Sequence, residues 1–186
     1  IQTKISLIEK NKDNDDINTI NEIKDLLNKQ DERDNEIYNQ ILDEQFDNGI
    51  HNTFKINLKK KTNLSDEEIN LQLDRIDKYL SRIKLTILVT KKYYDRVRPS
   101  ILSKELYKRG IIEKELEPWI EIPTHPSYPS GHATQTMYIA TILTHFDQDN
   151  KELYEQIADE ISTNREIAGL HYRSDSLAGY ELGRKL

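Results

Sequence analysis

Apolar residues recur at helical spacing along most of the chain. In the first half they recur at helical spacing from Ile20 to Leu27 and again from Ile37 to Leu42, which is the period of one helix face. Asn48-Gly49, a pair typical of turns, follows this run, so the pattern predicts one long helix or two shorter ones that end there. A charged face opposite an apolar stripe is typical of any surface helix, and we therefore expect this half to be scaffold.

A second helix is predicted to begin after Ser65. Ser65 followed by Glu68 is a capping box, in which each side chain bonds the other residue's backbone amide. Apolar residues at helical spacing continue from there to Ile87, so we expect this helix to place Lys91 near its C-terminal end. Pro99 disfavours helical geometry at the residue before it, which predicts a turn at Arg98.

The remainder of the chain predicts an irregular loop and further helices. Four prolines between Glu115 and Pro129 indicate a loop of the kind that carries function. We find no strand alternation and no internal repeat, so the expected fold class is all-α, a helix bundle in one helical domain over residues 1–186. Within it we expect a helical scaffold over 1–64 and a core that carries the motifs over 65–186. The last three helices are predicted over Gly131 to about Phe146, Glu152 to about His171, and Asp175 to the end.

The first sixteen residues are too polar to form a unit of their own. Ile1, Ile5, Leu7 and Ile8 precede an Asn/Asp/Lys run that reaches Asp16. So hydrophilic a run cannot bury enough apolar surface to pack independently. We interpret this stretch as a lead-in or an edge of the bundle.

Composition narrows the classes of function. The 186 residues are enough for one core, and the absence of cysteine excludes thiol catalysis, zinc–thiolate sites and disulfides. A net charge of -6 argues against nucleic acid as a partner, because phosphate backbones are bound by clustered Lys and Arg. The apolar run Leu85–Val89 is far shorter than the roughly 20 residues that span a bilayer, and no signal-peptide core follows the N-terminus. We expect a soluble chain with no transmembrane segment; its compartment stays open, because a leader could precede Ile1, and a homo-oligomer stays an open alternative.

Two short stretches have residue types suited to holding a tetrahedral oxyanion. Lys91 and Arg98 lie seven positions apart, which is two helical turns and places both nearly on one face. Lys offers a compact charge, and Arg offers a planar fork of donors. Downstream, Ser130 and Gly131 precede a predicted helix, where an N-cap hydroxyl, a close backbone amide and the positive helix end form an oxyanion cradle. His132 then lies in the first helical turn, where it can donate a proton.

A third stretch adds a nucleophile. Arg165 is a third positive donor, and His171 is followed four residues later by Asp175. A carboxylate at that spacing can fix the imidazole tautomer and leave the other ring nitrogen to attack. Each stretch alone is more often a solvated helix face, a turn or a surface pair, and only their joint occurrence predicts an active site.

Together these stretches resemble one superfamily, which joins type 2 phosphatidic acid phosphatases, soluble bacterial acid phosphatases and vanadium-dependent haloperoxidases. Its pattern is Lys, six residues, Arg-Pro; then Pro-Ser-Gly-His; then Ser-Arg, five residues, His, three residues, Asp. Lys91–Pro99, Pro129–His132 and Arg165–Asp175 reproduce this pattern in order, with Asn164 where Ser is usual. The resemblance covers about Lys91 to Leu186 and implies the helix bundle of that superfamily.

The resemblance also implies a role for each motif residue. His171 would attack phosphorus to form a phosphohistidine, Asp175 would orient it, and His132 would protonate the leaving alkoxide and later activate water. No cofactor and no divalent metal would be required, because cationic side chains stabilise the charge. By the same resemblance, the residues that bind the phosphate or vanadate oxygens are Lys91, Arg98, Ser130, Gly131 and Arg165.

Two branches of this superfamily remain as alternatives. The short spacers and the six-residue interval between Lys91 and Arg98 are closer to phosphatases, which favours a metal-independent hydrolase acting on a small-molecule or lipid phosphomonoester. The run from Pro123 to Gln135, however, is similar to seaweed bromoperoxidases, which carry a second histidine seven residues before the motif histidine, as His125 does here. That branch would use vanadate as cofactor in the same pocket, with His171 as its ligand, and His125 would tune halide oxidation. The alternative for His125 is a loop histidine that packs between the prolines or lies at the edge of the pocket. A non-catalytic anion-binding scaffold is a third, disfavoured alternative, because binding alone needs no pair of histidines with a carboxylate.

Overall fold

The fold is built from helices alone in the part of the chain that is described. The structure is a computed structural model that describes residues 8–45 and 47–186, and no strand occurs among them. The predicted all-α class is therefore confirmed. The helices are α2 (Ile17–Asp31), α3 (Asn35–Asp43), α4 (Asp47–Lys61), α5 (Asp66–Tyr94), α6 (Pro99–Lys108), α7 (Gly131–Phe146), the 3-10 helix η1 (Gln148–Asn150), α8 (Lys151–Ile167) and α9 (Arg173–Lys185).

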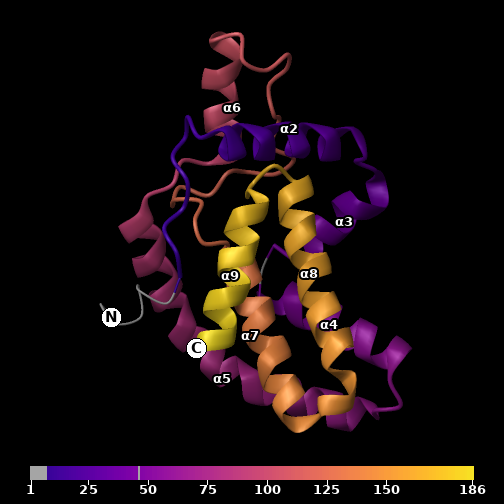
Figure 1. Ribbon diagram of the computed structural model, residues 1–186. Coiled ribbons are helices and arrows are strands. Elements are labelled where there is room, and N and C mark those ends of the chain that lie inside the picture. Colours follow the sequence, from indigo (N-terminus) through magenta and orange to yellow (C-terminus); the bar gives the residue numbers. More distant parts are fainter. Residues whose placement is uncertain (1–7, 46) are drawn as a thin grey trace.

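Helix α7 lies at the centre of the bundle, with α8 and α9 packed along it (Figure 1). Two glycines of α9 allow the close approach. A Cβ on Gly179 would lie 2.7 Å from the Ala133 Cβ, and one on Gly183 would lie 2.6 Å from the Thr134 carbonyl oxygen. Since real Cβ atoms do not come so close, any larger residue would push the two helices apart. The contact brings the N-terminal ends of α7 and α9, which carry two of the three motifs, to one place.

Helix α5 supplies the first motif. Ser65 and Glu68 form the predicted capping box, and the apolar face from Ile69 to Ile87 is buried in the main core. The helix ends at Tyr94, and Asp95 then takes the left-handed conformation with φ 49°. Lys91 therefore lies in the last turn of α5, as predicted.

The predicted common helix face of Lys91 and Arg98 is wrong. The chain leaves the helix at Asp95, and Arg98 has extended geometry as the N-cap of α6, with Pro99 in the first turn of that helix. The turn predicted at Arg98 is thus present, whereas α6 itself was not predicted. The two cations converge because the chain reverses, not because they share a helix.

The N-terminal half also departs from its prediction. Asn48-Gly49 lies inside α4 instead of ending the helical region. Local turn preference is overridden here because Ile50, Phe54 and Leu58 are buried in the main core. A Cβ on Gly49 would overlap the Asp43 carbonyl oxygen, so this glycine lets α4 pass directly over the end of α3.

Two boundaries near the third motif also differ. Helix α8 ends at Ile167 and not near His171, because Gly169 takes a left-handed conformation with φ 77°. Helix α9 begins at Arg173, two residues before the predicted start at Asp175. His171 therefore lies in the short connection between α8 and α9, where its side chain is held by the loop and not by a helix face.

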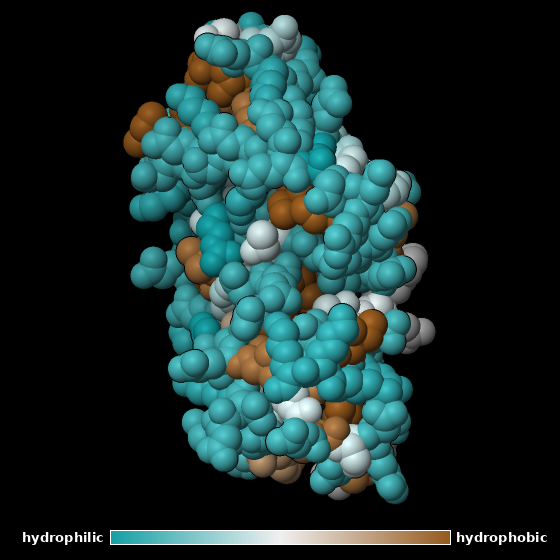
Figure 2. Space-filling view, turned by 90° about the vertical axis from the view of Figure 1, so that its right-hand side faces the viewer, coloured by the Kyte–Doolittle hydropathy of each residue, from teal (hydrophilic) through white to brown (hydrophobic). Residues whose placement is uncertain are grey.

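Ile8 packs against Tyr128 and Leu182, so the end of the predicted lead-in does contribute to a core, whereas Ile1, Ile5 and Leu7 lie outside the described residues. The face that Figure 2 shows is largely hydrophilic, and the apolar residues on it form small separate groups. Among residues 8–45 and 47–186, no helix combines the length and the apolar character needed to cross a membrane.

Candidate active site

Six of the predicted site residues surround one cavity of about 280 Å³. They come from the end of α5, the start of α6, the proline-rich loop, the start of α7 and the α8–α9 connection, so every motif reaches it. The predicted residues that line the cavity are Lys91, Arg98, His125, Gly131, His132 and His171. The others in its wall are Gln45, Lys84, Ile87, Leu88, Pro123, Gln135 and Leu170.

Lys91 is a buried cation at the inner wall. Only 1% of the Lys91 surface is exposed to solvent. Its Nζ donates hydrogen bonds to the carbonyl oxygens of Pro126 (3.0 Å) and Ser127 (2.8 Å). An ammonium group has three hydrogens, so these two bonds leave one for a ligand. Burial, and next the charge of Arg98, hold the pKa of Lys91 well below its usual value.

Arg98 ties the proline-rich loop to the α8–α9 connection. Nε and Nη2 each donate to the His125 carbonyl oxygen at 3.1 Å, and Nη1 donates to the Leu170 carbonyl oxygen at 2.8 Å. Nη1 also lies 3.2 Å from His171 Nε2. Burial lowers the pKa of Arg98 to about 10, so the guanidinium stays charged at neutral pH.

His171 and Asp175 form the predicted pair. His171 Nδ1 lies 3.1 Å from Asp175 Oδ2, and the carboxylate can only accept, so Nδ1 carries the proton. Arg98 can only donate, so Nε2 of the neutral ring presents its lone pair toward the Arg98 guanidinium. Burial, and next the charge of Arg98, hold the pKa of His171 well below its usual value, which keeps the ring neutral.

Asp175 is itself held by several donors. Its Oδ2 also accepts from the Tyr172 amide at 3.1 Å and from the Ser127 hydroxyl. Burial alone would raise the pKa of Asp175, but the hydrogen bond from His171 and the charge of Arg96 hold it below its usual range. Asp175 therefore stays ionised and fixes the orientation of the His171 ring.

Arg96 is a site-supporting residue that the sequence did not reveal. Nη1 donates to Asp175 Oδ1 at 2.6 Å, Nη2 donates to Glu22 Oε2 at 3.1 Å, and the guanidinium stacks 3.8 Å from the Tyr172 ring centre. The residue lies within the first motif, between Lys91 and Arg98, but nothing in its spacing distinguishes it from a solvated arginine. Glu22, which also accepts from the Ser174 amide and hydroxyl, comes from the half in which we expected only scaffold.

Ser130 and His132 begin α7. The Ser130 hydroxyl oxygen accepts from the Ala133 amide as the helix N-cap, which leaves its own hydrogen to donate, and its backbone amide donates to the Asp175 carbonyl. Ser130 does not line the cavity directly. His132 does, and its Nε2 donates to the Glu44 carbonyl oxygen at 2.8 Å, which places a proton on that nitrogen.

Arg165 is not among the residues of the cavity wall. In the last turn of α8, its Nη2 donates to the Ile41 carbonyl oxygen at 2.7 Å and lies 3.4 Å from Glu44 Oε2. Nε and Nη1 are buried and have no hydrogen-bond partner among the described residues. Buried donors of a cation that have no partner are costly, so these two nitrogens need an explanation.

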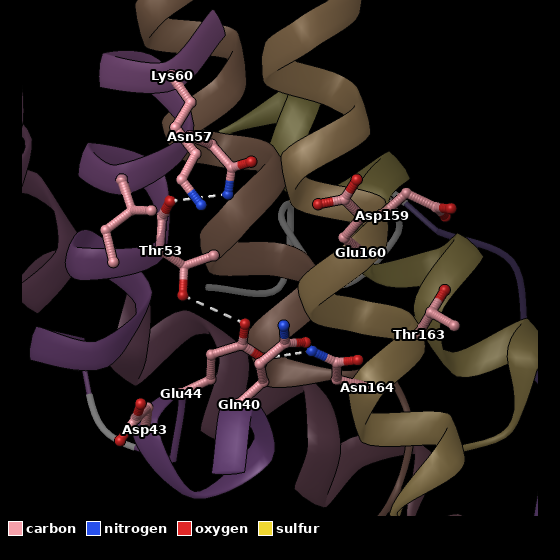
Figure 3. A pocket seen from close by; sticks show the side chains of 11 residues that line it. Gln40, Asp43, Glu44, Thr53, Asn57, Lys60, Asp159, Glu160, Thr163 and Asn164 are labelled. Carbon is pink, nitrogen blue, oxygen red and sulfur yellow. Dashed lines mark hydrogen bonds between the residues drawn. The ribbon is translucent and has the colours of Figure 1, made fainter. Parts of the chain in front are cut away.

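A larger cavity of about 580 Å³ lies between α8 and the α3–α4 segment (Figure 3). Apart from Ile56, the residues that line it are polar, and they include Asp43, Glu44, Asp159 and Glu160. None of the predicted site residues lines it, although Asn164 of the third motif does. Volume alone therefore does not choose between the two cavities, because the smaller one is lined by the two motif histidines, His132 and His171.

A family model supports the assignment that the three motifs suggest. The model of the PAP2 superfamily matches residues 79–184, which include all three motifs and more than half of the chain. The chain belongs to the PAP2 superfamily.

Individual PAP2 relatives that resemble the chain include haloperoxidases. A vanadium-dependent bromoperoxidase from Ascophyllum nodosum is 31% identical over 93 residues, covering 34% of this chain and 17% of that protein. The crystal structure of the first bacterial vanadium-dependent iodoperoxidase superposes with a TM-score of 0.65 at 16% identity, covering 96% of this chain and 50% of that one. At this identity the second likeness shows the fold alone. The chain thus spans about half the length of the iodoperoxidase and a smaller part of the bromoperoxidase.

Proposed function

We propose that this PAP2 protein is a metal-independent phosphatase that hydrolyses phosphomonoesters through a phosphohistidine on His171. One observation carries the proposal. His171 has its Nδ1 proton bonded to Asp175 and its Nε2 lone pair 3.2 Å from Arg98 Nη1, at the wall of a cationic cavity. A neutral imidazole oriented by a carboxylate and facing an anion-binding group is a nucleophile ready for phosphorus.

The oxyanion would be held by donors on several sides. Lys91 has one ammonium hydrogen beyond its two carbonyl bonds, and Arg165 has Nε and Nη1 without partners among the described residues. The Gly131 amide and the Ser130 hydroxyl lie at the positive end of α7. All these donors are neutral or positive, which suits a transition state that spreads charge over the equatorial oxygens.

Arg98 would change partner when substrate binds. Its contacts to His125, Leu170 and His171 use the hydrogens of the guanidinium, and the contact to His171 Nε2 is the one made to the nucleophilic lone pair. When that hydrogen moves to a phosphate oxygen, Nε2 is released for attack. The same movement therefore binds the oxyanion and exposes the nucleophile.

The reaction then takes two displacements. His171 Nε2 forms a bond to phosphorus while the bond from phosphorus to the leaving oxygen breaks, and His132 protonates that oxygen. Because Nε2 of His132 donates to the Glu44 carbonyl, we assign the transferred proton to Nδ1 of its protonated ring. His132, now neutral, takes a proton from water as the water attacks phosphorus, the nitrogen–phosphorus bond breaks, and phosphate leaves.

The cavity limits the substrate. A volume of about 280 Å³ is at the small end of ligand sites, and the inner wall is cationic while Ile87, Leu88 and Leu170 are apolar. This shape suits a small phosphomonoester, or a lipid headgroup presented at its mouth.

The test is hydrolysis of p-nitrophenyl phosphate in EDTA, with and without orthovanadate. We expect turnover that persists in EDTA, that orthovanadate inhibits, and that His171→Ala abolishes. Turnover that EDTA stops, or that His171→Ala leaves intact, would refute the proposed mechanism.

A second candidate is a vanadate-dependent haloperoxidase, and His125 favours it. This residue lines the cavity with Nδ1 3.0 Å from Arg98 Nη2, in the run that is similar to bromoperoxidases. The donors of Lys91, Arg98 and Arg165 would fit vanadate as they fit phosphate, with His171 Nε2 as its ligand, and the unpaired Arg165 hydrogens support that fit. Bound vanadate would supply activation of peroxide for halide oxidation. Bromination of a phenol indicator by vanadate-loaded protein and peroxide, without p-nitrophenyl phosphate turnover, would select this candidate, and silence in both assays would favour the non-catalytic scaffold.

A further inference from the structure

The C-terminal end of α3 contacts two of the residues that the proposed reaction uses. The Ile41 carbonyl oxygen accepts from Arg165 Nη2 at 2.7 Å, and Glu44 Oε2 lies 3.4 Å from the same nitrogen. The Glu44 carbonyl oxygen accepts from His132 Nε2 at 2.8 Å. A short segment of the N-terminal half, 88 residues from His132 in sequence, thus touches both the acid–base histidine and Arg165.

Glu44 is fixed in place from two other helices. Its Oε2 accepts from Asn164 Nδ2 of α8 at 2.9 Å, and its Oε1 accepts from Thr53 Oγ1 of α4 at 3.2 Å (Figure 3). The residue is only 2% exposed, although it borders the larger cavity. Donors on both oxygens leave the carboxylate a single orientation, so Arg165 meets a rigid partner.

The contacts divide the Arg165 guanidinium into two parts. Both hydrogens of Nη2 point at the end of α3, whereas Nε and Nη1 have no partner among the described residues. A carboxylate near an oxyanion site repels the ligand unless a cation already neutralises it, and Glu44 is paired in this way. The presence of Glu44 near the site is therefore explained if its carboxylate orients Arg165 and offsets the cost of burying the Arg165 charge.

We propose that Glu44 is a positioning residue, which clamps Nη2 of Arg165 so that Nε and Nη1 face the oxyanion, and that Asn164 holds Glu44 for this task. This inference rests on the proposed oxyanion site and adds the residues that set its geometry. It also gives Asn164, which stands where the superfamily pattern has Ser, a function of its own. A serine side chain is shorter and lacks the amide that bonds Glu44.

The backbone of Glu44 adds a second effect on the same site. Because its carbonyl accepts from His132 Nε2, it fixes a proton on that nitrogen, and the exchange with the leaving group is assigned above to Nδ1. Glu44 thus contacts Arg165 through its side chain and His132 through its backbone.

The experiment measures orthovanadate binding by isothermal titration calorimetry at pH 7, with no turnover involved. The variants are Glu44→Gln, which removes the charge, and Asn164→Ser, which removes the support and changes no charge. Asp43→Asn is the matched control, because Asp43 is exposed, borders the same larger cavity and loses the same charge. Thermal melting of each variant separates a loss of fold from a loss of binding.

We expect Glu44→Gln and Asn164→Ser each to weaken vanadate binding about tenfold or more, as is common when the partners of site ligands are removed. The double variant should bind no more weakly than Glu44→Gln alone, because Asn164 acts through Glu44. Asp43→Asn should bind like the wild type. The pH profile of p-nitrophenyl phosphate turnover should also shift in Glu44→Gln, through His132.

Other outcomes distinguish the claims. Unchanged or tighter binding in both folded variants would overturn the positioning role and leave Glu44 with a purely structural or opposing effect. Wild-type protein that binds vanadate but does not hydrolyse the ester would refute the phosphatase and not this inference. Wild-type protein that binds neither orthovanadate nor inorganic phosphate would overturn both.

Discussion

Arg96 and Asp175 form a buried ion pair in which Nη1 lies 2.6 Å from Oδ1, and neither side chain has exposed surface. The pair leaves Oδ2 of the same carboxylate for the His171 ring. Arg96 is in turn held by Glu22 of α2, so a chain of contacts runs from the N-terminal half to the nucleophile. The cations of the first motif therefore have different tasks, since Arg96 holds Asp175 while Lys91 and Arg98 line the cavity.

Replacing Arg96 by methionine should be strongly destabilising. It removes one partner of a buried ion pair and leaves Asp175 charged without its main counter-ion, a change that costs about 3–5 kcal/mol. Chemical denaturation of Arg96→Met against wild type measures the loss. Arg109→Met is the matched control, because Arg109 pairs with Asp15 on the surface, and it should unfold like the wild type. Equal stability of both variants would contradict the role assigned to Arg96.

The neutral state of His171 predicts a pH dependence of stability. Its folded pKa lies well below the usual value because of burial and the nearby Arg98, whereas the unfolded chain takes up a proton near pH ~6.5. The unfolded state thus binds more protons below that pH, and the free energy of unfolding contributed by this group falls as the pH drops. Denaturation of wild type and His171→Gln between pH 7.5 and about 5 should show the steeper decline in the wild type. Parallel curves would mean that His171 titrates normally in the folded protein.

Local sequence signals predicted much of the fold. The Ser65–Glu68 capping box and the proline after Arg98 act within a few residues, and both features lie where they were predicted. The turn preference of Asn48-Gly49 is also a local signal, but burial of Phe54 in the main core outweighs it. No pattern within this segment reveals that Phe54 will be buried.

For the site, too, some residues could be predicted from the sequence and others could not. The superfamily motifs predicted five residues of the cavity wall, and the similarity to bromoperoxidases predicted a sixth, His125. Three residues that support the site, Arg96, Glu22 and Glu44, reach the motif residues only in the folded chain. No sequence pattern reveals that an acidic side chain such as Glu22 or Glu44 will pair with an arginine far away in the sequence. Arg165 was predicted to bind the oxyanion oxygens, yet it is not among the residues that line the cavity. Its role as an oxyanion donor stays a prediction.

Lys91 should be far more important for activity than its neighbour Lys92. The Lys91 ammonium is buried beside Arg98 with one hydrogen left for the oxyanion, whereas Lys92 is exposed on α5. Removing one preorganised donor of an oxyanion site lowers turnover by about 10²–10³. We expect Lys91→Met to lose about 100-fold or more in kcat/KM for p-nitrophenyl phosphate, and Lys92→Met to match the wild type. Similar losses in both variants would indicate a general charge effect instead of a positioned donor.

His125 offers a test that separates the two branches of the superfamily. Arg98 bonds the backbone carbonyl of His125 through Nε and Nη2, and these bonds survive any change of side chain. The Nδ1 atom of the His125 ring lies 3.0 Å from Arg98 Nη2 and 3.2 Å from the Pro126 carbonyl oxygen. To accept from Arg98 it must carry a lone pair, and to donate to Pro126 it must carry a proton. The ring therefore makes only one of these two hydrogen bonds at a time. Losing one such hydrogen bond is worth about 0.5–1.5 kcal/mol, or roughly tenfold at most.

His125→Ala should therefore lower phosphate ester hydrolysis by less than about tenfold. His145→Ala, at an exposed position of α7 away from the cavity, controls for the loss of an imidazole. The same two variants, loaded with vanadate, can be assayed for bromide oxidation with peroxide. A small effect on hydrolysis with no bromide oxidation in any variant agrees with the phosphatase. A wild type that oxidises bromide, and loses that activity in His125→Ala but not in His145→Ala, would assign the ring of His125 to halide chemistry and make the haloperoxidase the better description of the site.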